Sequence, residues 1–295
     1  MKNMSKKIIF FGTEEFSLTA LTGLIEADYD IAAVVTKPDS RKGRGHTLSP
    51  PSVKVIASQH NIPVWQPDKL NTIEDDIRKL GTVTGVLVSY GKIIPKSTID
   101  LFSPGIINVH PSLLPKYRGP SPIESAILHG DKTTGVSIMQ LSAEMDAGPI
   151  YAQQEYTLQG TETRPELYQH LSAEGTTLLL ETLPKILTGT LSPTPQDDRQ
   201  ATYCRLLEKA DAILDPNLLT ADEAERHVRA FLGYPRSKIL FDGIQLIVTK
   251  THVATHAQTP LDLHCRDGAV LSIDELIAPS GRLMSAEAYL RGLRR

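Results

Sequence analysis

IINVHPSLLPKYRGPSP, residues 106–122, is the stretch from which both the fold and the site of this chain are predicted. It opens with a short apolar run typical of a strand, on which side chains alternate and place Asn108 and His110 on one face. Pro111 has no N–H group and ends the strand. Two hydrogen-bonding side chains are therefore expected at the carboxyl end of a strand, which is where ligands bind in open α/β sheets.

The second half of this stretch predicts a shaped loop. Ser112, Leu113, Leu114 and Pro115 form a rigid segment of apolar residues and proline that can wall a pocket. Glycine and further prolines follow, which favours turns over helix or strand. Lys116, Tyr117 and Arg118 have two readings that the sequence leaves open: they contact a phosphate or the tail of a ligand, or they only solvate the loop.

Outward from this stretch, strand-like and helical patterns alternate through the first 188 residues. The β-rich runs at 7–11, 29–36 and 85–89 read as buried parallel strands, and amphipathic segments separate them. This alternation predicts a doubly wound, mostly parallel, Rossmann-like sheet. The loop at 90–95 is expected to leave its strand beside the Asn-His strand. The first glycine turn lacks G-x-G-x-x-G, which disfavours a dinucleotide-dependent oxidoreductase.

The pattern changes after a Pro/Thr/Asp-rich segment, so we expect a first domain at 1–188, a linker at 189–205 and a second domain at 206–295. In the second domain, Thr220 and Glu223 form a capping box before a helix. Asp-Gly pairs at 242–243 and 267–268 indicate hairpins. Short strands with tight turns predict a small β-barrel, OB-like in class.

Composition narrows the functional classes. The chain has 295 residues, 40% apolar and 22% charged, as in an ordinary soluble protein. No apolar run is long enough to cross a bilayer, and the formal net charge of −3 argues against an extensive nucleic-acid surface. The two cysteines lack metal spacing, and the histidines show no ligand pair. We expect a cytoplasmic protein without a metal.

A basic loop at residues 37–51 is the exception to this neutral balance. Arg41, Lys42 and Arg44 stand among glycines and prolines. Arginine side chains bind phosphate in a bidentate manner, and glycines let a backbone approach closely. Taken alone, such a run is more often a solvated loop than a nucleic-acid contact.

Three polar residues are candidates for chemistry: Asn108, His110 and Asp146, the last in a turn after a later strand. An amide and an imidazole can both donate to a developing oxyanion, and a carboxylate can orient the imidazole and favour its charged form. No G-x-S-x-G nucleophile motif is present, which favours direct acyl transfer over a covalent intermediate. From spacing alone, an equally good reading is that these residues close turns.

The motifs favour the chemical reading. Asn108-Val-His110, the Ser-Leu-Leu-Pro segment with Arg118-Gly119, and Met-Asp146-Ala-Gly resemble the 10-formyltetrahydrofolate-dependent formyltransferase superfamily. The resemblance spans nearly the whole chain. It includes Phe-Gly-Thr at 11–13, Thr-Lys-Pro-Asp at 36–39 and several carboxy-terminal motifs, and it is strongest to the members that act on methionyl-initiator tRNA.

The resemblance implies catalytic roles for Asn108, His110 and Asp146. It implies a folate pocket, for which we expect these residues: Ser112, Leu113, Leu114, Pro115, Tyr90, Gly91 and Ile93. It also implies tRNA contacts by Arg41, Lys42 and Arg44, and a tRNA-binding role for the second domain. The expected co-substrate is 10-formyltetrahydrofolate, and the expected acceptor is the free amino group of methionyl-initiator tRNA. We expect a monomer. Two alternatives are a formyltransferase for a small amine, such as a sugar nucleotide or glycinamide ribonucleotide, and a non-catalytic tRNA-binding homologue.

Overall fold

The computed structural model describes residues 7–42 and 47–293, which fall into two compact units. The first unit holds the described residues up to Pro120, together with Gly135–Tyr156 and Tyr168–Cys204. The second unit holds Ser121–Thr134, Thr157–Leu167 and the chain from Arg205 onward. The predicted linker residues up to Cys204 thus group with the first unit, and two earlier segments group with the second.

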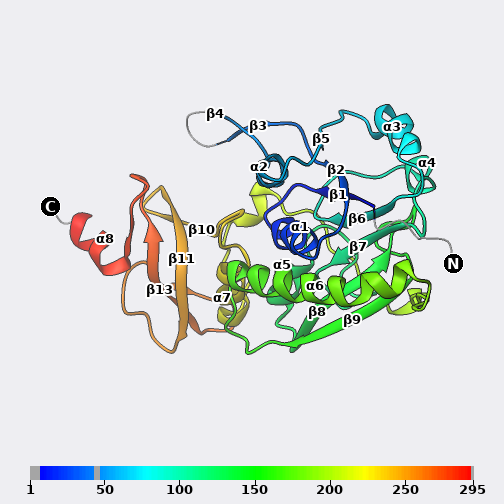
Figure 1. Cartoon of the computed structure of the whole chain (residues 1–295). Helices are drawn as coiled ribbons and strands as arrows, with labels where there is room; N and C mark the ends of the chain where they lie inside the picture. The colour runs from blue at the N-terminus through cyan, green and yellow to red at the C-terminus, as the bar shows by residue number, and fades with distance from the viewer. Residues whose placement is uncertain (1–6, 43–46, 294–295) are drawn as a thin grey trace. The chain divides into compact units, whose positions relative to one another are not determined.

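The first unit is built on one sheet (Figure 1). Among the described residues its strand order is β5-β2-β1-β6-β7-β8-β9, and the run from β5 to β7 is parallel. This confirms the mostly parallel, Rossmann-like sheet. The strands are β1 Ile8–Gly12, β2 Ile31–Val35, β5 Val64–Trp65, β6 Thr84–Val88, β7 Ile106–His110, β8 Thr133–Gln140 and β9 Ile150–Thr157.

The central strands read as continuous apolar runs because both faces of the sheet are covered. All residues of β1 and β7 are buried. On one side of the sheet a core cluster gathers around Phe11, whose ring meets those of Tyr90 and Phe102 edge to face. The helices are α1 Phe16–Glu26, α2 Ser52–Gln59, α3 Glu74–Lys79, α4 Lys96–Ile99 and α6 Arg164–Leu187, with short 3₁₀ turns η1 Leu70–Ile73 and η2 Asp198–Gln200.

Two strand pairings decide which loops reach the site. β6 and β7 are parallel with Leu87 opposite Asn108, so the loop after β6 leaves at the edge where His110 ends β7, as expected. β8 is antiparallel to β7 and ends with Gln140 opposite Ile107, at the far end of β7. The segment 141–149 must therefore return along the sheet before Asp146 can approach His110.

The basic loop contains regular structure that the sequence did not indicate. β3 Ser40–Lys42 and β4 Thr47–Ser49 form a two-stranded antiparallel ribbon, with Arg41 opposite Leu48. Arg41 is exposed. The side chain of Lys42, and Arg44 as a whole, lie outside the described residues.

The second unit is an antiparallel half-barrel sheet. Its order is β10-β11-β13-β12, and β14 pairs with β13. The strands are β10 Lys238–Phe241, β11 Ile244–Ala254, β12 Leu263–His264, β13 Val270–Ile277 and β14 Leu283–Ser285. The helices are α5 Pro122–His129, α7 Ala221–Ala230 and α8 Ala286–Leu293, with the 3₁₀ turn η3 Lys209–Ala212. The OB-like class of this sheet stays a prediction.

Local signals in the second unit were predicted correctly. The Thr220 hydroxyl accepts from the Glu223 N–H at 3.2 Å, and the Glu223 carboxylate accepts from the Thr220 N–H at 2.8 Å, which completes the capping box. Asp242 and Gly243 have φ of 47° and 76° between paired strands β10 and β11. Two successive positive φ angles are the signature of a type I′ hairpin turn.

None of the helices in the described part of the chain combines the length and the apolar character that a bilayer crossing requires.

Candidate active site

The candidate site begins on β7. Asn108 and His110 are two residues apart on this strand, so they share a face of the sheet, and each is only 5% exposed. The side-chain amide of Asn108 makes no hydrogen bond to any other residue that the structure describes. Polar groups of buried residues are usually paired within the protein, so an amide without such a partner is available to a ligand.

Both nitrogens of the His110 ring have a neighbour. Nε2 lies 2.9 Å from the carbonyl oxygen of Tyr117, and Nδ1 lies 3.8 Å from Oδ2 of Asp146. Because a carbonyl oxygen only accepts, the neutral ring carries its proton on Nε2 and turns the lone pair of Nδ1 toward the carboxylate. Protonation of Nδ1 converts this contact into a charge-assisted pair.

Asp146 is held in place by a neighbouring loop. Its side chain is 16% exposed, and its Oδ2 accepts the N–H of Gly119 at 2.8 Å. Its backbone is left-handed, with φ of 48°, which is uncommon for a residue other than glycine. The structure therefore brings the carboxylate to the imidazole, by way of the returning segment after β8.

The predicted folate residues at 112–115 divide into a buried and a more open group. Ser112 is fully buried, and its hydroxyl donates to the carbonyl of Lys116 at 2.6 Å. Leu114 is 3% exposed, and its N–H donates to the hydroxyl of Ser137 at 3.1 Å. Leu113 and Pro115 are half-buried. Ser112 and Leu114 thus build the loop, and the other two are accessible.

The loop after β6 divides in the same way. Tyr90 is 1% exposed and its hydroxyl has no partner among the described residues. Burial raises the pKa of Tyr90 to about 12. Its ring packs against Phe11 in the core. Gly91 is exposed and Ile93 is 86% exposed, so these two can meet a ligand directly.

Arg118 has neither of the roles that the sequence suggested for it. It is 2% exposed, so it does not solvate the loop. Its guanidinium donates to Oε1 of Gln196 at 2.9 Å and to Oδ1 of Asp198 at 2.6 Å. Nη1 also donates to the Tyr203 hydroxyl at 3.3 Å. The guanidinium is therefore paired within the protein, and its partners all lie in the segment 189–205 that was predicted to be a linker.

Gln196 is a residue of the site that the sequence analysis missed. Its Nε2 donates to the carbonyl oxygens of Asp146 at 2.8 Å and Gly148 at 2.7 Å. It stands in a stretch of prolines and aspartates typical of a solvated link, so no local signal marks it.

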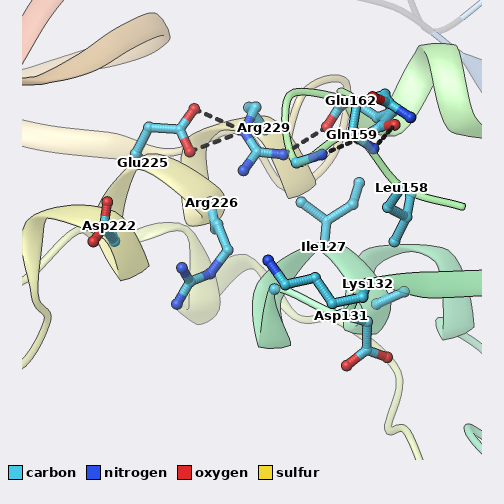
Figure 2. A pocket seen from close by; sticks show the side chains of 13 residues that line it. Ile127, Asp131, Lys132, Leu158, Gln159, Glu162, Asp222, Glu225, Arg226 and Arg229 are labelled. Atoms are coloured by element: carbon cyan, nitrogen blue, oxygen red, sulfur yellow. Dashed lines mark hydrogen bonds and ion pairs between the residues drawn. The ribbon is translucent and has the colours of Figure 1, made fainter.

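A pocket of about 220 Å³ lies within the second unit (Figure 2), and none of the predicted site residues lines it. Two of its charged groups are already paired. Arg229 donates to the carboxylate of Glu225 at 2.7 Å and to the carbonyl of Glu162 at 2.8 Å. Among the residues described, no group of three or more His, Cys, Asp and Glu side chains is arranged to hold a metal ion.

The arrangement on β7 and its neighbouring loops offers three functions at one edge of the sheet. An unpaired amide can donate to a developing negative charge, an imidazole can exchange a proton, and a carboxylate can stabilise the charged ring. Such a set suits addition of a nucleophile to a carbonyl carbon.

Comparison with known proteins gives the family. The profile of the formyl transferase family matches residues 6–183. The methionyl-tRNA formyltransferase of Geobacter metallireducens is 37% identical over 298 residues, covering 97% of this chain and 96% of that protein. The enzyme of the same name from Myxococcus xanthus is 36% identical, covering 97% and 95%.

Solved structures agree on the fold. An N-formyltransferase from Helicobacter canadensis, in complex with folinic acid and dTDP-3-aminofucose, has a TM-score of 0.66 at 18% identity and covers 90% of this chain and 97% of that chain. A sugar 3N-formyl transferase, solved with dTDP and 5-N-formyl-THF, has a TM-score of 0.68 at 17% identity and covers 90% and 96%. With a family profile over more than half of the chain and relatives matched along nearly all of it, this chain belongs to the methionyl-tRNA formyltransferase family.

Proposed function

We propose that this enzyme transfers the formyl group of 10-formyltetrahydrofolate to the free amino group of methionyl-initiator tRNA, with Asn108, His110 and Asp146 as the catalytic residues. The family relationship supports the reaction. The observation that carries the site is the amide of Asn108, a residue only 5% exposed whose side chain has no partner among the described residues, beside an imidazole that faces a carboxylate.

In the reaction, the amine attacks the formyl carbon, and the electron pair of the C=O bond moves to oxygen. The Asn108 N–H donates to this oxyanion. His110 adds its Nε2–H, which the Tyr117 carbonyl holds in the free enzyme. Hydrogen bonds of this kind are often reorganised when substrate binds. The intermediate then collapses, the bond between the carbon and N10 of the folate breaks, and the leaving nitrogen takes a proton.

Asp146 acts as the proton acceptor in this scheme. It stabilises the charged form of His110 and takes up the proton that the attacking amine loses as the new C–N bond forms. The backbone N–H of Gly119 stays on Oδ2 throughout and keeps the carboxylate directed at the ring. One proton is lost by the amine and one is gained by the folate nitrogen, so the transfer is balanced.

For the folate, we propose contacts with the accessible residues of the two loops: Gly91, Ile93, Leu113 and Pro115. Ser112, Leu114 and Tyr90 support these loops from inside. For the tRNA, we propose phosphate contacts by the basic ribbon, through Arg41, Lys42 and Arg44, and by the second domain at 206–295. A monomer that acts in the cytoplasm remains our prediction.

The test is an acceptor assay with purified enzyme and 10-formyltetrahydrofolate. We expect formyl-methionyl-tRNA as the product with charged initiator tRNA, and turnover at least about a hundred-fold lower with a sugar nucleotide or glycinamide ribonucleotide. Faster transfer to either small amine would reject the proposed acceptor. Binding of tRNA with no product from any acceptor would identify a non-catalytic homologue.

A further inference from the structure

We propose that Gln196 is a positioning residue for the reaction: oriented by Arg118, its carboxamide holds the Asp146 segment in the conformation that turns the carboxylate toward His110. The proposal rests on the proposed function of the Asp146–His110 pair. All residues involved belong to the first unit.

The Asp146 segment needs an external support. Asp146 is left-handed with φ of 48°, a conformation that aspartate adopts less readily than glycine and that surrounding contacts help to hold. Neither Asp146 nor Gly148 lies in a strand. Gln196 supplies the support, because its two amide hydrogens go to the carbonyl oxygens of Asp146 and Gly148 at 2.8 and 2.7 Å.

Arg118 fixes which way the carboxamide faces. Nε and Nη2 of Arg118 both donate to Oε1 of Gln196, at 3.1 and 2.9 Å. This fork leaves the NH₂ group of Gln196 directed at the two carbonyls. Arg118 is itself held by Asp198 at 2.6 Å and is 2% exposed, so the orientation is imposed by a buried group.

The same arginine also links the two halves of the catalytic pair. Its neighbours in sequence are Tyr117, whose carbonyl contacts His110 Nε2, and Gly119, whose N–H contacts Asp146 Oδ2. One network therefore fixes the loop that holds both side chains and the segment that carries Asp146. At 3.8 Å the Nδ1–Oδ2 contact is sensitive to small displacements. Misplacement by about 1 Å can cost on the order of a hundred-fold in rate.

Two substitutions separate the roles of the carboxamide. Gln196→Ala removes every hydrogen bond of the side chain. Gln196→Glu keeps the shape and the partner for Arg118, but it turns the donor that faces two carbonyls into an acceptor. The matched control is Gln200→Ala, in the same segment, where the glutamine is exposed and its side chain donates to Asp197.

We expect kcat to fall about ten- to a hundred-fold in both Gln196 variants, while KM for tRNA and folate stays within about two-fold. Gln200→Ala should match the wild type. In an Asp146→Asn background, measured in single turnover, Gln196→Ala should cause no further loss, because the residue acts through Asp146. A merely structural role would instead make the two losses multiply.

A second readout does not depend on turnover. Exchange of the Gly119 amide hydrogen, followed by NMR, should be faster in Gln196→Glu than in the wild type and unchanged in Gln200→Ala. Unchanged exchange, or kcat within two-fold of the wild type in Gln196→Ala, would overturn the positioning role. If the wild type itself formylates no acceptor, the proposed function fails, and the exchange measurement still decides whether Gln196 holds Asp146.

Discussion

Asp146 and Asp242 share a left-handed backbone, with φ of 48° and 47°, but they adopt it for different reasons. Asp242 precedes Gly243 in a two-residue turn, and the paired strands on either side, with Phe241 opposite Ile244, impose the conformation. Everything required lies within a few residues. This is the turn chemistry that an Asp-Gly pair indicates.

At Asp146 the supporting contacts come from distant segments. Gly119, 27 residues away, holds the carboxylate, and Gln196, 50 residues away, holds the backbone. The same dihedral angle is therefore a local property in one unit and a tertiary one in the other. We expect the Asp242 turn to be altered by substitutions that change backbone preference. We expect the Asp146 turn to be altered by the loss of its charge or of its distant partners.

The largest effect should follow from Asp146→Asn. Asparagine tolerates the left-handed backbone and keeps an acceptor for the Gly119 N–H, so the fold should be unchanged. Loss of the carboxylate removes the acid–base partner of His110, and we expect kcat/KM to fall about 10²–10⁴-fold. Steady-state kinetics and a thermal melt check both parts. Near-normal turnover would reject Asp146 as a catalytic residue, and a lowered Tm would show that conformation and charge cannot be separated here.

Asn108→Ala tests the other part of the site. Loss of an oxyanion donor should lower kcat about a hundred- to a thousand-fold. The amide has no partner among the described residues to be left unpaired, so the melting temperature should change little. Kinetics with both substrates at saturation measure the effect. If Tm falls strongly while kcat holds, Asn108 is a structural residue.

Asp242→Ala tests the local turn. Alanine lacks the tolerance of Asp and Asn for this backbone region, and we expect a loss of about 1 kcal/mol in the free energy of unfolding. Asp242→Asn is the control and should be nearly neutral, since Asn-Gly favours the same turn. Urea titration of the three proteins provides the comparison. Equal stability of the Ala and Asn variants would contradict a turn governed by backbone preference.

The smallest effect concerns His227, a second buried histidine. Burial lowers the pKa of His227, whose ring contacts the Ser237 hydroxyl and the Asp211 carbonyl, each at 2.9 Å. The unfolded chain therefore takes up a proton first as pH falls below about 6.5, and stability should decrease there. His227→Gln, which keeps hydrogen-bonding groups, should flatten this dependence in melts between pH 5 and 7. An unchanged slope would exclude His227 as its source.

Features with local causes could be predicted from the sequence, and features held by distant segments could not. The parallel sheet, the Thr220 capping box and the Asp242–Gly243 hairpin were predictable because their causes are periodic or adjacent in sequence. The meeting of His110 and Asp146 was expected from motifs, but the antiparallel β8 and the returning segment that produce it were not. The sheet pairing there is set by tertiary packing, which no local pattern encodes.

Polar residues with distant partners were the hardest to place. From its position in a loop after a strand, Arg118 is expected to be a cation on the surface. The structure shows instead that it is buried and donates to the side chain of Gln196. The short ribbon around Arg41 was also missed, because the glycines and charges between its strands and the prolines on either side outweigh any alternation. The roles of the folate and tRNA residues remain predictions.

The place of Gln196 has a practical consequence for anyone trimming this protein to a minimal catalytic fragment. The family profile ends at residue 183, and the domain boundary predicted from composition falls at 188. A fragment cut at either point would retain Asn108, His110 and Asp146. It would lack Gln196, whose side chain donates to the backbone carbonyls of Asp146 and Gly148. We expect such a fragment to have low formyl transfer activity even toward a soluble amine too small to require the second unit. Extension of the fragment to Cys204 should restore this activity.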